Sequence, residues 1–250
     1  MISELATWFI LFCPLLAFLI IGVIVWPFIG KKSKVSGYVT IAAILCSTIL
    51  SFWALGSVIH NGHALEFKSH NWIEIQNIEI NVGIMLDGLT TIMLVVVSSV
   101  SLLVQIYSTG YMKHDGGYSR YFTYMSLFTA SMIGLVLASN LIQMFVFWEL
   151  VGASSYLLIG FWFNKPAAAA AAKKAFIVTR LGDFGFLLAI LYLFFNSGTF
   201  LSNGLNPFEV VDINNAVALG VISTSVAGWV AVGMFAGAMG KSAQVPFHTW

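Results

Sequence analysis

Four ionisable residues lie well inside long apolar stretches of the sequence: Glu149, Arg180, Asp183 and Lys241. An Asp, Lys or Arg at the centre of a membrane helix costs about 2.5–3.5 kcal/mol. We therefore expect the four side chains to face one another, water or both. Arg180 and Asp183 are three residues apart, so they share one helix face and can pair directly. Groups of this kind are typical of proton relays in pumps and transporters.

Lys241 has the most unusual sequence surroundings of the four. It follows Gly233, Gly237 and Gly240, and Pro246 comes shortly after it. This pattern predicts a helix that breaks and restarts at membrane depth, and transporters place ion sites at such breaks. An apolar environment favours loss of the lysine proton, whereas a nearby carboxylate opposes it. Moving the charge partner of that carboxylate would therefore switch the lysine between holding and releasing a proton.

The roles of these residues remain open to more than one interpretation. For Arg180 and Asp183, a structural ion pair that joins helices and a functional pair are equally open, because an i,i+3 pair satisfies itself. Glu149 and Lys241 have no partner on their own helix, which favours a functional role. His248 lies about two turns beyond Lys241 if the helix resumes. It either extends a proton path, since His titrates near neutrality, or only adds a polar lining.

No other cluster in the sequence has the spacing of a catalytic, cofactor or metal site. Cys13 and Cys46 both lie in apolar runs, so they form neither a disulfide framework nor a metal motif. His60, His63 and His70 are scattered over a loop, and we predict no metal site there. The chain has no visible means of doing redox chemistry itself.

The composition indicates an integral membrane protein. Charged residues make up 8% of the 250 residues and hydrophobic residues 59%, whereas an ordinary globular protein has about 25% charged residues. A soluble surface needs far more charge than this. The net charge of +1 excludes an electrostatic nucleic-acid binder, which would need a basic face.

Seven stretches are long and apolar enough to cross a bilayer core of roughly 30 Å. They cover 5–29, 37–60, 87–112, 121–139, 141–163, 175–196 and 217–240. We therefore predict an all-α polytopic membrane protein with about seven transmembrane helices, the last of them broken. The first stretch lacks a positive leading region and is too long for a cleaved signal.

The distribution of Lys and Arg predicts the orientation of these helices. Assigning alternate loops puts eight cations on one side: Lys31, Lys32, Lys34, Lys113, Arg120, Lys165, Lys173 and Lys174. The opposite side has only Lys68. Because cytoplasmic loops carry the excess of positive charge, we expect the N-terminus on the outer face.

Two longer loops are predicted on that outer face. In the loop 61–86, apolar residues alternate on both sides of Gln76-Asn77, which predicts a short hairpin; an irregular loop is nearly as compatible with the pattern. The loop 197–216 contains Glu209 and Asp212, and a short helical turn is expected after Pro207.

Three strings resemble one family of membrane proteins: Phe147-Trp-Glu-Leu-Val-Gly-Ala-Ser-Ser-Tyr156, Lys173-Lys-Ala-Phe-Ile-Val-Thr-Arg-Leu-Gly-Asp-Phe-Gly185 and Met239-Gly-Lys-Ser-Ala-Gln-Val-Pro-Phe-His-Thr-Trp250. They are similar to the large antiporter-like subunit of respiratory complex I, NADH:quinone oxidoreductase, called subunit L or chain 5. The resemblance runs from about residue 85 to residue 250. Residues 1–84 match mainly in the number of spans and the outer hairpin.

The resemblance implies roles for the buried charges. By motif position, Glu149 corresponds to the midplane glutamate of that family and Lys241 to the lysine on its first broken helix. Arg180 and Asp183 correspond to the pair on the helix between them. The implied function is proton translocation coupled to electron transfer in other subunits, with Lys241 as proton carrier, Glu149, Arg180 and Asp183 in coupling, and His248 as a further candidate.

The resemblance also implies the surroundings of the chain. Other complex I membrane subunits, above all a neighbouring antiporter-like subunit, would be its partners, together with the lipid bilayer and protons. NADH, FMN, iron–sulfur clusters and quinone are implied in partner subunits, and no cofactor in this chain. An energy-transducing membrane, most simply the bacterial inner membrane, is the implied location.

Family members are much longer than 250 residues, so the resemblance implies an N-terminal fragment that would not pump protons alone. Residues 1–120 would form N-terminal helices and the outer hairpin, and residues 121–250 the truncated start of the antiporter-like domain. Subunits of multisubunit Na⁺/H⁺ antiporters share the same Glu and Lys and remain an alternative. A structural membrane subunit whose buried pairs only join helices is the second alternative.

Overall fold

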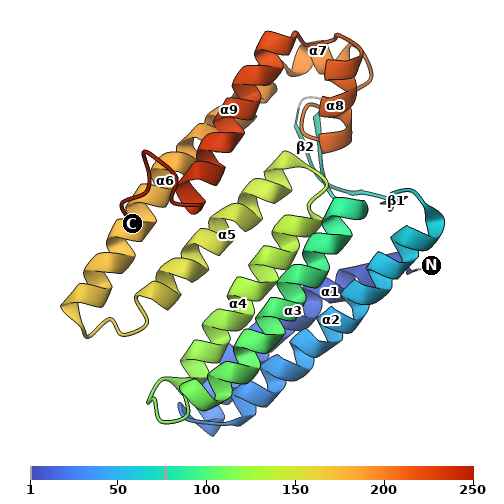
Figure 1. Cartoon of the computed structure of the whole chain (residues 1–250). Coiled ribbons are helices and arrows are strands. Elements are labelled where there is room, and N and C mark those ends of the chain that lie inside the picture. The colour runs from blue at the N-terminus through green and yellow to red at the C-terminus, as the bar shows by residue number, and fades with distance from the viewer. Residues whose placement is uncertain (1, 76–77) are drawn as a thin grey trace. The chain divides into compact units, whose positions relative to one another are not determined.

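The computed structural model describes residues 2–75 and 78–250, and helices dominate it (Figure 1). The helical segments are α1 (Glu4–Leu19), the π-helical η1 (Ile20–Ile29), α2 (Val35–Asn61), α3 (Gly88–Tyr111), α4 (Tyr118–Leu137), α5 (Leu141–Ile159), α6 (Pro166–Phe195), α7 (Ser197–Leu201), α8 (Val210–Ala218) and α9 (Thr224–Lys241). The strands are β1 (Leu65–Glu66), β2 (His70–Ile75), β3 (Ile78–Val82) and β4 (Met85–Leu86).

Each predicted apolar stretch is helical over most of its length, with two displaced boundaries. α6 begins at Pro166 instead of residue 175, because proline suits the first helical position and Ala167–Ala172 is a run of the strongest helix former. α9 begins at Thr224 instead of residue 217, because Gly220 has a φ of 70° and the chain turns after α8.

Five helices of the described chain are long and apolar enough to cross a membrane. They are the continuous segment Glu4–Ile29, Val35–Asn61, Gly88–Tyr111, Leu141–Ile159 and Pro166–Phe195. The 30 residues of α6 give a length of about 45 Å, which matches a bilayer including its headgroup regions.

The chain divides into two compact units, and each is described by itself. The first comprises Met1–Phe67 and Ile84–Leu137, and the second comprises Lys68–Gly83 and Ala138–Trp250. The division falls after Leu137, because α4 packs against α1, α2 and α3 and so stays with the first unit.

Buried hydroxyl groups join the helices of the first unit. Ser126 Oγ donates to Thr40 Oγ1 at 3.2 Å, and the Ser101 and Thr129 hydroxyl groups are 2.6 Å apart. The fully buried Gln105 amide donates to the same two hydroxyl groups. Small polar side chains of this kind allow close packing of apolar helices.

Glycines hold α6 and α9 together in the second unit, where the two helices lie side by side (Figure 1). A Cβ on Gly182 would lie 2.7 Å from the Ala236 carbonyl oxygen, and a Cβ on Gly233 would lie 2.8 Å from the Gly185 carbonyl oxygen. The backbones therefore approach as only glycine permits.

Strands β2 and β3 form an antiparallel ribbon that belongs to the second unit. Ile75 lies opposite Ile78, while the predicted turn Gln76-Asn77 lies outside the described residues. Asn140 Nδ2 donates to the Asn81 carbonyl at 2.5 Å and joins the ribbon to the start of α5. This bond explains why the ribbon is part of the second unit.

The end of α9 differs from the sequence prediction. The helix ends at Lys241, as the glycines indicated, but residues 242–250 form turns and no second helix. The indole nitrogen of Trp250 donates to the Gly240 carbonyl at 2.9 Å and returns this segment to the helix end. The helical spacing proposed between Lys241 and His248 is therefore wrong in this structure.

Candidate functional site

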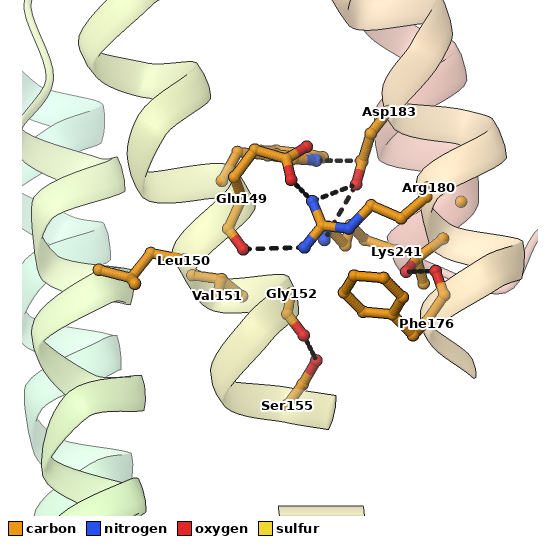
Figure 2. Close-up of polar contacts among 12 residues, drawn as sticks. Glu149, Leu150, Val151, Gly152, Ser155, Phe176, Arg180, Asp183 and Lys241 are labelled. Atoms are coloured by element: carbon orange, nitrogen blue, oxygen red, sulfur yellow. Dashed lines mark hydrogen bonds and ion pairs between the residues drawn. The ribbon is translucent and has the colours of Figure 1, made fainter. Parts of the chain in front are cut away.

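The four buried charges lie together in the second unit, on three helices. α5 carries Glu149, α6 carries Arg180 and Asp183, and Lys241 is the last residue of α9. Figure 2 shows the acidic side chains and the cations pointing toward one another between α5 and α6. We call Glu149, Arg180, Asp183 and Lys241 the charge cluster.

Arg180 lies at the centre of the charge cluster. One terminal nitrogen forms an ion pair with the Glu149 carboxylate and lies 3.3 Å from Asp183 Oδ2. The other terminal nitrogen donates to the Glu149 backbone carbonyl at 3.0 Å. The guanidinium thus bridges both carboxylates and the α5 backbone, which uses the rigid fork of donors that distinguishes Arg from Lys.

Asp183 is the most buried member, with 3% of its side chain exposed. Trp148 Nε1 donates to Asp183 Oδ1 at 2.6 Å, and Lys241 Nζ lies 3.4 Å from Asp183 Oδ2. Together with Arg180, three donors from three helices surround this carboxylate. Such pairing is required for a charge removed from water.

Two aromatic rings flank the cations. The Arg180 guanidinium lies 4.6 Å from the centre of the Phe176 ring, and Lys241 Nζ lies 5.9 Å from the Trp148 ring. Both distances fall within the range of cation–π attraction. The rings also keep the surroundings apolar, which strengthens the interactions between the charges.

Gly152 on α5 makes room for the two cations. A Cβ at this position would lie 2.6 Å from Lys241 Nζ and 2.7 Å from a terminal nitrogen of Arg180. Any larger residue would displace one or both side chains. Gly152 therefore belongs to the site although it carries no chemistry of its own.

The charges alternate in sign along the chain of contacts Glu149, Arg180, Asp183 and Lys241. Glu149 at one end is the most accessible member, with 34% of its side chain exposed, and Asp183 is the least accessible, with 3%. A change of charge at one end alters the pairing of the next member. The arrangement can therefore pass an electrostatic change from one end to the other.

The sequence left open which carboxylate lies beside Lys241. In the structure Asp183 is the carboxylate beside the Lys241 amine, and Arg180 is the partner of Glu149. The reason is geometric: the Arg180 side chain extends from α6 toward α5 and occupies the position next to Glu149.

His248 is exposed in the turns that follow α9, and it is not part of the charge cluster. Trp148, Phe176 and Gly152 were not singled out from the sequence. Trp148 directly precedes Glu149, but spacing within α5 does not reveal that its indole nitrogen reaches α6. Among the described residues, no three His, Cys, Asp or Glu side chains gather as a metal site would require.

Two protein-family models together match most of the chain. Residues 138–250 match the model described as "NADH:quinone oxidoreductase/Mrp antiporter, TM". Residues 72–122 match "NADH-Ubiquinone oxidoreductase (complex I), chain 5 N-terminus". The first match begins where the second structural unit resumes, at Ala138, and it contains the whole charge cluster.

Curated relatives are similar over nearly the whole chain. The chloroplastic NAD(P)H-quinone oxidoreductase subunit 5 of Anthoceros angustus is 44% identical over 249 residues, which are 97% of this chain and 33% of the relative. NAD(P)H-quinone oxidoreductase chain 5 of Synechocystis is 40% identical and matches 97% of this chain and 35% of its own length. The chain thus spans about a third of the length of these relatives.

Two solved structures share the fold. A membrane-bound sulfane sulfur reductase, an archaeal respiratory membrane complex, has a chain with a TM-score of 0.74 at 17% identity, covering 99% of this chain and 47% of that one. The Mrp complex from Dietzia has a TM-score of 0.73 at 23% identity, covering 96% and 24%. The long apolar helices of this chain agree with a fold that occurs in membrane complexes. The chain is an integral membrane protein that belongs to the antiporter-like subunit family of NADH:quinone oxidoreductase, complex I.

Proposed function

We propose that the protein is a membrane subunit of NADH:quinone oxidoreductase that translocates protons, driven by electron transfer in other subunits. The observation that carries this proposal is the alternating charge cluster, in which Lys241 and Glu149 are joined through Asp183 and Arg180. The relatives with this name, of which the chain spans about a third, support the assignment.

In the proposed mechanism, Lys241 carries the proton and Arg180 transmits the change of charge. When Lys241 releases its proton, Asp183 keeps Arg180 as its cationic partner and attracts it more strongly. The pairing of Arg180 with Glu149 then weakens, and Glu149 is free to attract a positive charge. The coupling is reciprocal: protonation of Glu149 releases Arg180 toward Asp183, and this second cation at Asp183 disfavours the charged form of Lys241.

The free energy available from such a cluster is comparable to the free energy that proton translocation requires. Moving one proton against 100 mV takes about 2.3 kcal/mol. A hundredfold change in the proton affinity of Lys241 corresponds to about 2.7 kcal/mol. A shift of one cation between two carboxylates in apolar surroundings is sufficient for an effect of this size.

The proposal includes an orientation and a setting. We propose that α4 and α9 cross the membrane together with the five helices that meet the length and hydropathy criteria. The eight cations that the charge distribution assigns to one side would lie inside, with the N-terminus outside, in an energy-transducing membrane such as the bacterial inner membrane. A neighbouring antiporter-like subunit would contact the chain, and NADH, FMN, iron–sulfur clusters and quinone would be bound by partner subunits.

The decisive experiment replaces Lys241 by alanine in the full-length protein. Proton translocation into membrane vesicles, followed with a pH-sensitive dye during NADH oxidation, should fall at least tenfold. Lys174→Ala is the matched control, because Lys174 is an exposed lysine of α6 outside the charge cluster. Unchanged translocation in Lys241→Ala would remove Lys241 from the proton path.

A Na⁺/H⁺ antiporter subunit is the second candidate, because the family model for residues 138–250 covers both kinds of protein. Ion flux distinguishes them. An antiporter exchanges protons for Na⁺ without NADH, whereas the proposed subunit requires NADH oxidation and functions without Na⁺. If the cluster only joins helices, the double variant Glu149→Gln with Lys241→Met would leave ion movement intact.

A further inference from the structure

An open groove of about 490 Å³ lies between α5 and α6. Ala153, Tyr156, Leu157, Lys173, Phe176 and Ile177 line it. Its walls are apolar except for the Lys173 amine and the Tyr156 hydroxyl group. Ile177 is 60% exposed and Tyr156 38% exposed, so the groove opens on the surface of the second unit. We call these six residues the α5–α6 groove.

The position of Lys173 along α6 allows its side chain to reach the lipid phosphate groups. Lys173 lies seven residues from the start of the 30-residue helix, about 10 Å along its axis. A bilayer of about 40–45 Å contains a hydrocarbon core of about 30 Å. When α6 spans it symmetrically, Lys173 lies near the core boundary, where a long lysine side chain reaches the headgroups.

The rest of the groove extends from this point toward the bilayer centre. Phe176 and Ile177 are on the next turn of α6, away from its start. The groove is therefore cationic at headgroup depth and apolar along the depth of the acyl chains. This order of chemistry corresponds to one molecule with an anionic head and an apolar tail.

We propose that the α5–α6 groove binds an anionic phospholipid, with its phosphate on the Lys173 ammonium and one acyl chain along Tyr156, Phe176 and Ile177. Charge complementarity favours this occupant over an apolar helix, which would cover Lys173 without pairing it. Basic pockets between transmembrane helices are known to bind anionic headgroups.

The groove is continuous with the charge cluster through Phe176. The face of this ring lies 4.6 Å from the Arg180 guanidinium, and Tyr156 packs on the ring with its centre 5.4 Å away. A bound acyl chain would hold Phe176 in place and thereby limit the movement of Arg180. This consequence rests on the proposed function, whereas lipid binding itself does not.

The binding is tested on the full-length protein in nanodiscs, using phosphatidylglycerol with a photoactivatable group on its acyl chain. Mass spectrometry then locates the labelled peptides. We expect labelling of residues 153–157 and 173–177 that unlabelled phosphatidylglycerol suppresses at least fivefold more strongly than phosphatidylcholine. The exposed face of α3, which includes Leu89 and Leu103, serves as the internal control for general contact with lipid.

Matched variants separate a specific site from general lipid contact. Lys173→Glu should reduce labelling of the groove at least fivefold, and the neighbouring exposed Lys174→Glu less than twofold. Ala153→Phe, which fills the groove but keeps Lys173, should reduce it to a similar extent. Two outcomes would overturn the proposal. One is an equal effect of Lys173→Glu and Lys174→Glu on labelling. The other is labelling of the α3 control face without labelling of the groove, which would indicate that another segment covers the groove. Because labelling needs no proton translocation, this outcome is independent of the proposed function.

Discussion

Asp183 Oδ2 lies 3.4 Å from Lys241 Nζ and 3.3 Å from a terminal nitrogen of Arg180. One carboxylate oxygen on α6 therefore holds both cations of the charge cluster. Lys241 is linked to Glu149 through Asp183 and Arg180. In the proposed mechanism the coupling of the two ends therefore depends on the negative charge at Asp183.

Replacing Asp183 by asparagine should reduce proton translocation at least tenfold. The variant leaves Arg180 and Lys241 with the Glu149 carboxylate, the partner of Arg180, as the remaining negative charge of the cluster, so the alternation of charges is lost. Translocation by membrane vesicles is the measurement. Because removing one partner of a buried ion pair destabilises a protein by about 3–5 kcal/mol, Asp183→Glu is needed beside it. This charge-retaining variant should recover part of the activity, whereas equal activities of the two variants would contradict the prediction.

Gly152→Ala should reduce translocation about three- to tenfold without lowering stability. The atoms that a new methyl group would meet are the ends of two flexible side chains, Lys241 and Arg180. Those side chains can move while the backbone stays, so the charges shift and the fold remains. Translocation and thermal unfolding are measured on the same preparation.

Gly228→Ala on α9 is the matched control for Gly152→Ala, since no heavy atom lies within 4 Å of its added Cβ. It should leave translocation unchanged. A Gly152→Ala protein with full activity would show that the cations have other positions available.

The members of the charge cluster were easier to predict from their residue types than the pairings among them. Four charges in apolar stretches had to face one another, water or both, because leaving them alone in lipid is costly. Which carboxylate contacts which cation depends on the rotation of α5 and α6 about their axes, and residue spacing within one helix does not contain that information. The Trp148 to Asp183 hydrogen bond was missed for the same reason.

Helix boundaries were predictable where the local sequence signals agreed. They were misplaced where two sequence signals indicated different boundaries. The two lysines at 173 and 174 suggested a loop, but the alanine run before them extends α6 back to Pro166. The end of the first unit after Leu137 was also not visible in the sequence, because it depends on how α4 packs against the earlier helices and on the bond from Asn140 to the β2–β3 ribbon.

Gly182→Ala should lower stability by about 1–3 kcal/mol, the usual effect of overpacking. Its Cβ would lie 2.7 Å from the Ala236 carbonyl oxygen and 3.0 Å from Gly240 Cα. Both are backbone atoms of α9 and cannot turn away, so the two helices must separate. The midpoint of thermal unfolding in detergent should fall for Gly182→Ala and not for Gly228→Ala. Equal midpoints would mean that α6 and α9 are less closely packed than the structure indicates.

Glu209, in the loop before α8, should make stability depend on pH. Burial raises the pKa of its carboxyl above the usual 4.5, and the nearby negative charge of Asp212 adds to this effect. The folded protein therefore binds this proton more tightly than the unfolded chain. The resulting stabilisation is complete below pH 4.5 and is lost as the pH rises through the pKa of the folded state.

Glu209→Gln keeps the shape of the side chain but cannot titrate, so it should not lose stability in this way. Relative to the wild-type protein, its midpoint of thermal unfolding should rise as the pH increases from 4.5 toward neutrality. Glu74→Gln on the exposed face of β2 is the control, and its difference from the wild-type protein should be constant across the series. If the difference in unfolding midpoint between Glu209→Gln and the wild-type protein is also constant, the prediction is contradicted. Hydrogen-bond donors in the folded protein then stabilise the Glu209 carboxylate, because only an uncompensated buried charge opposes ionisation.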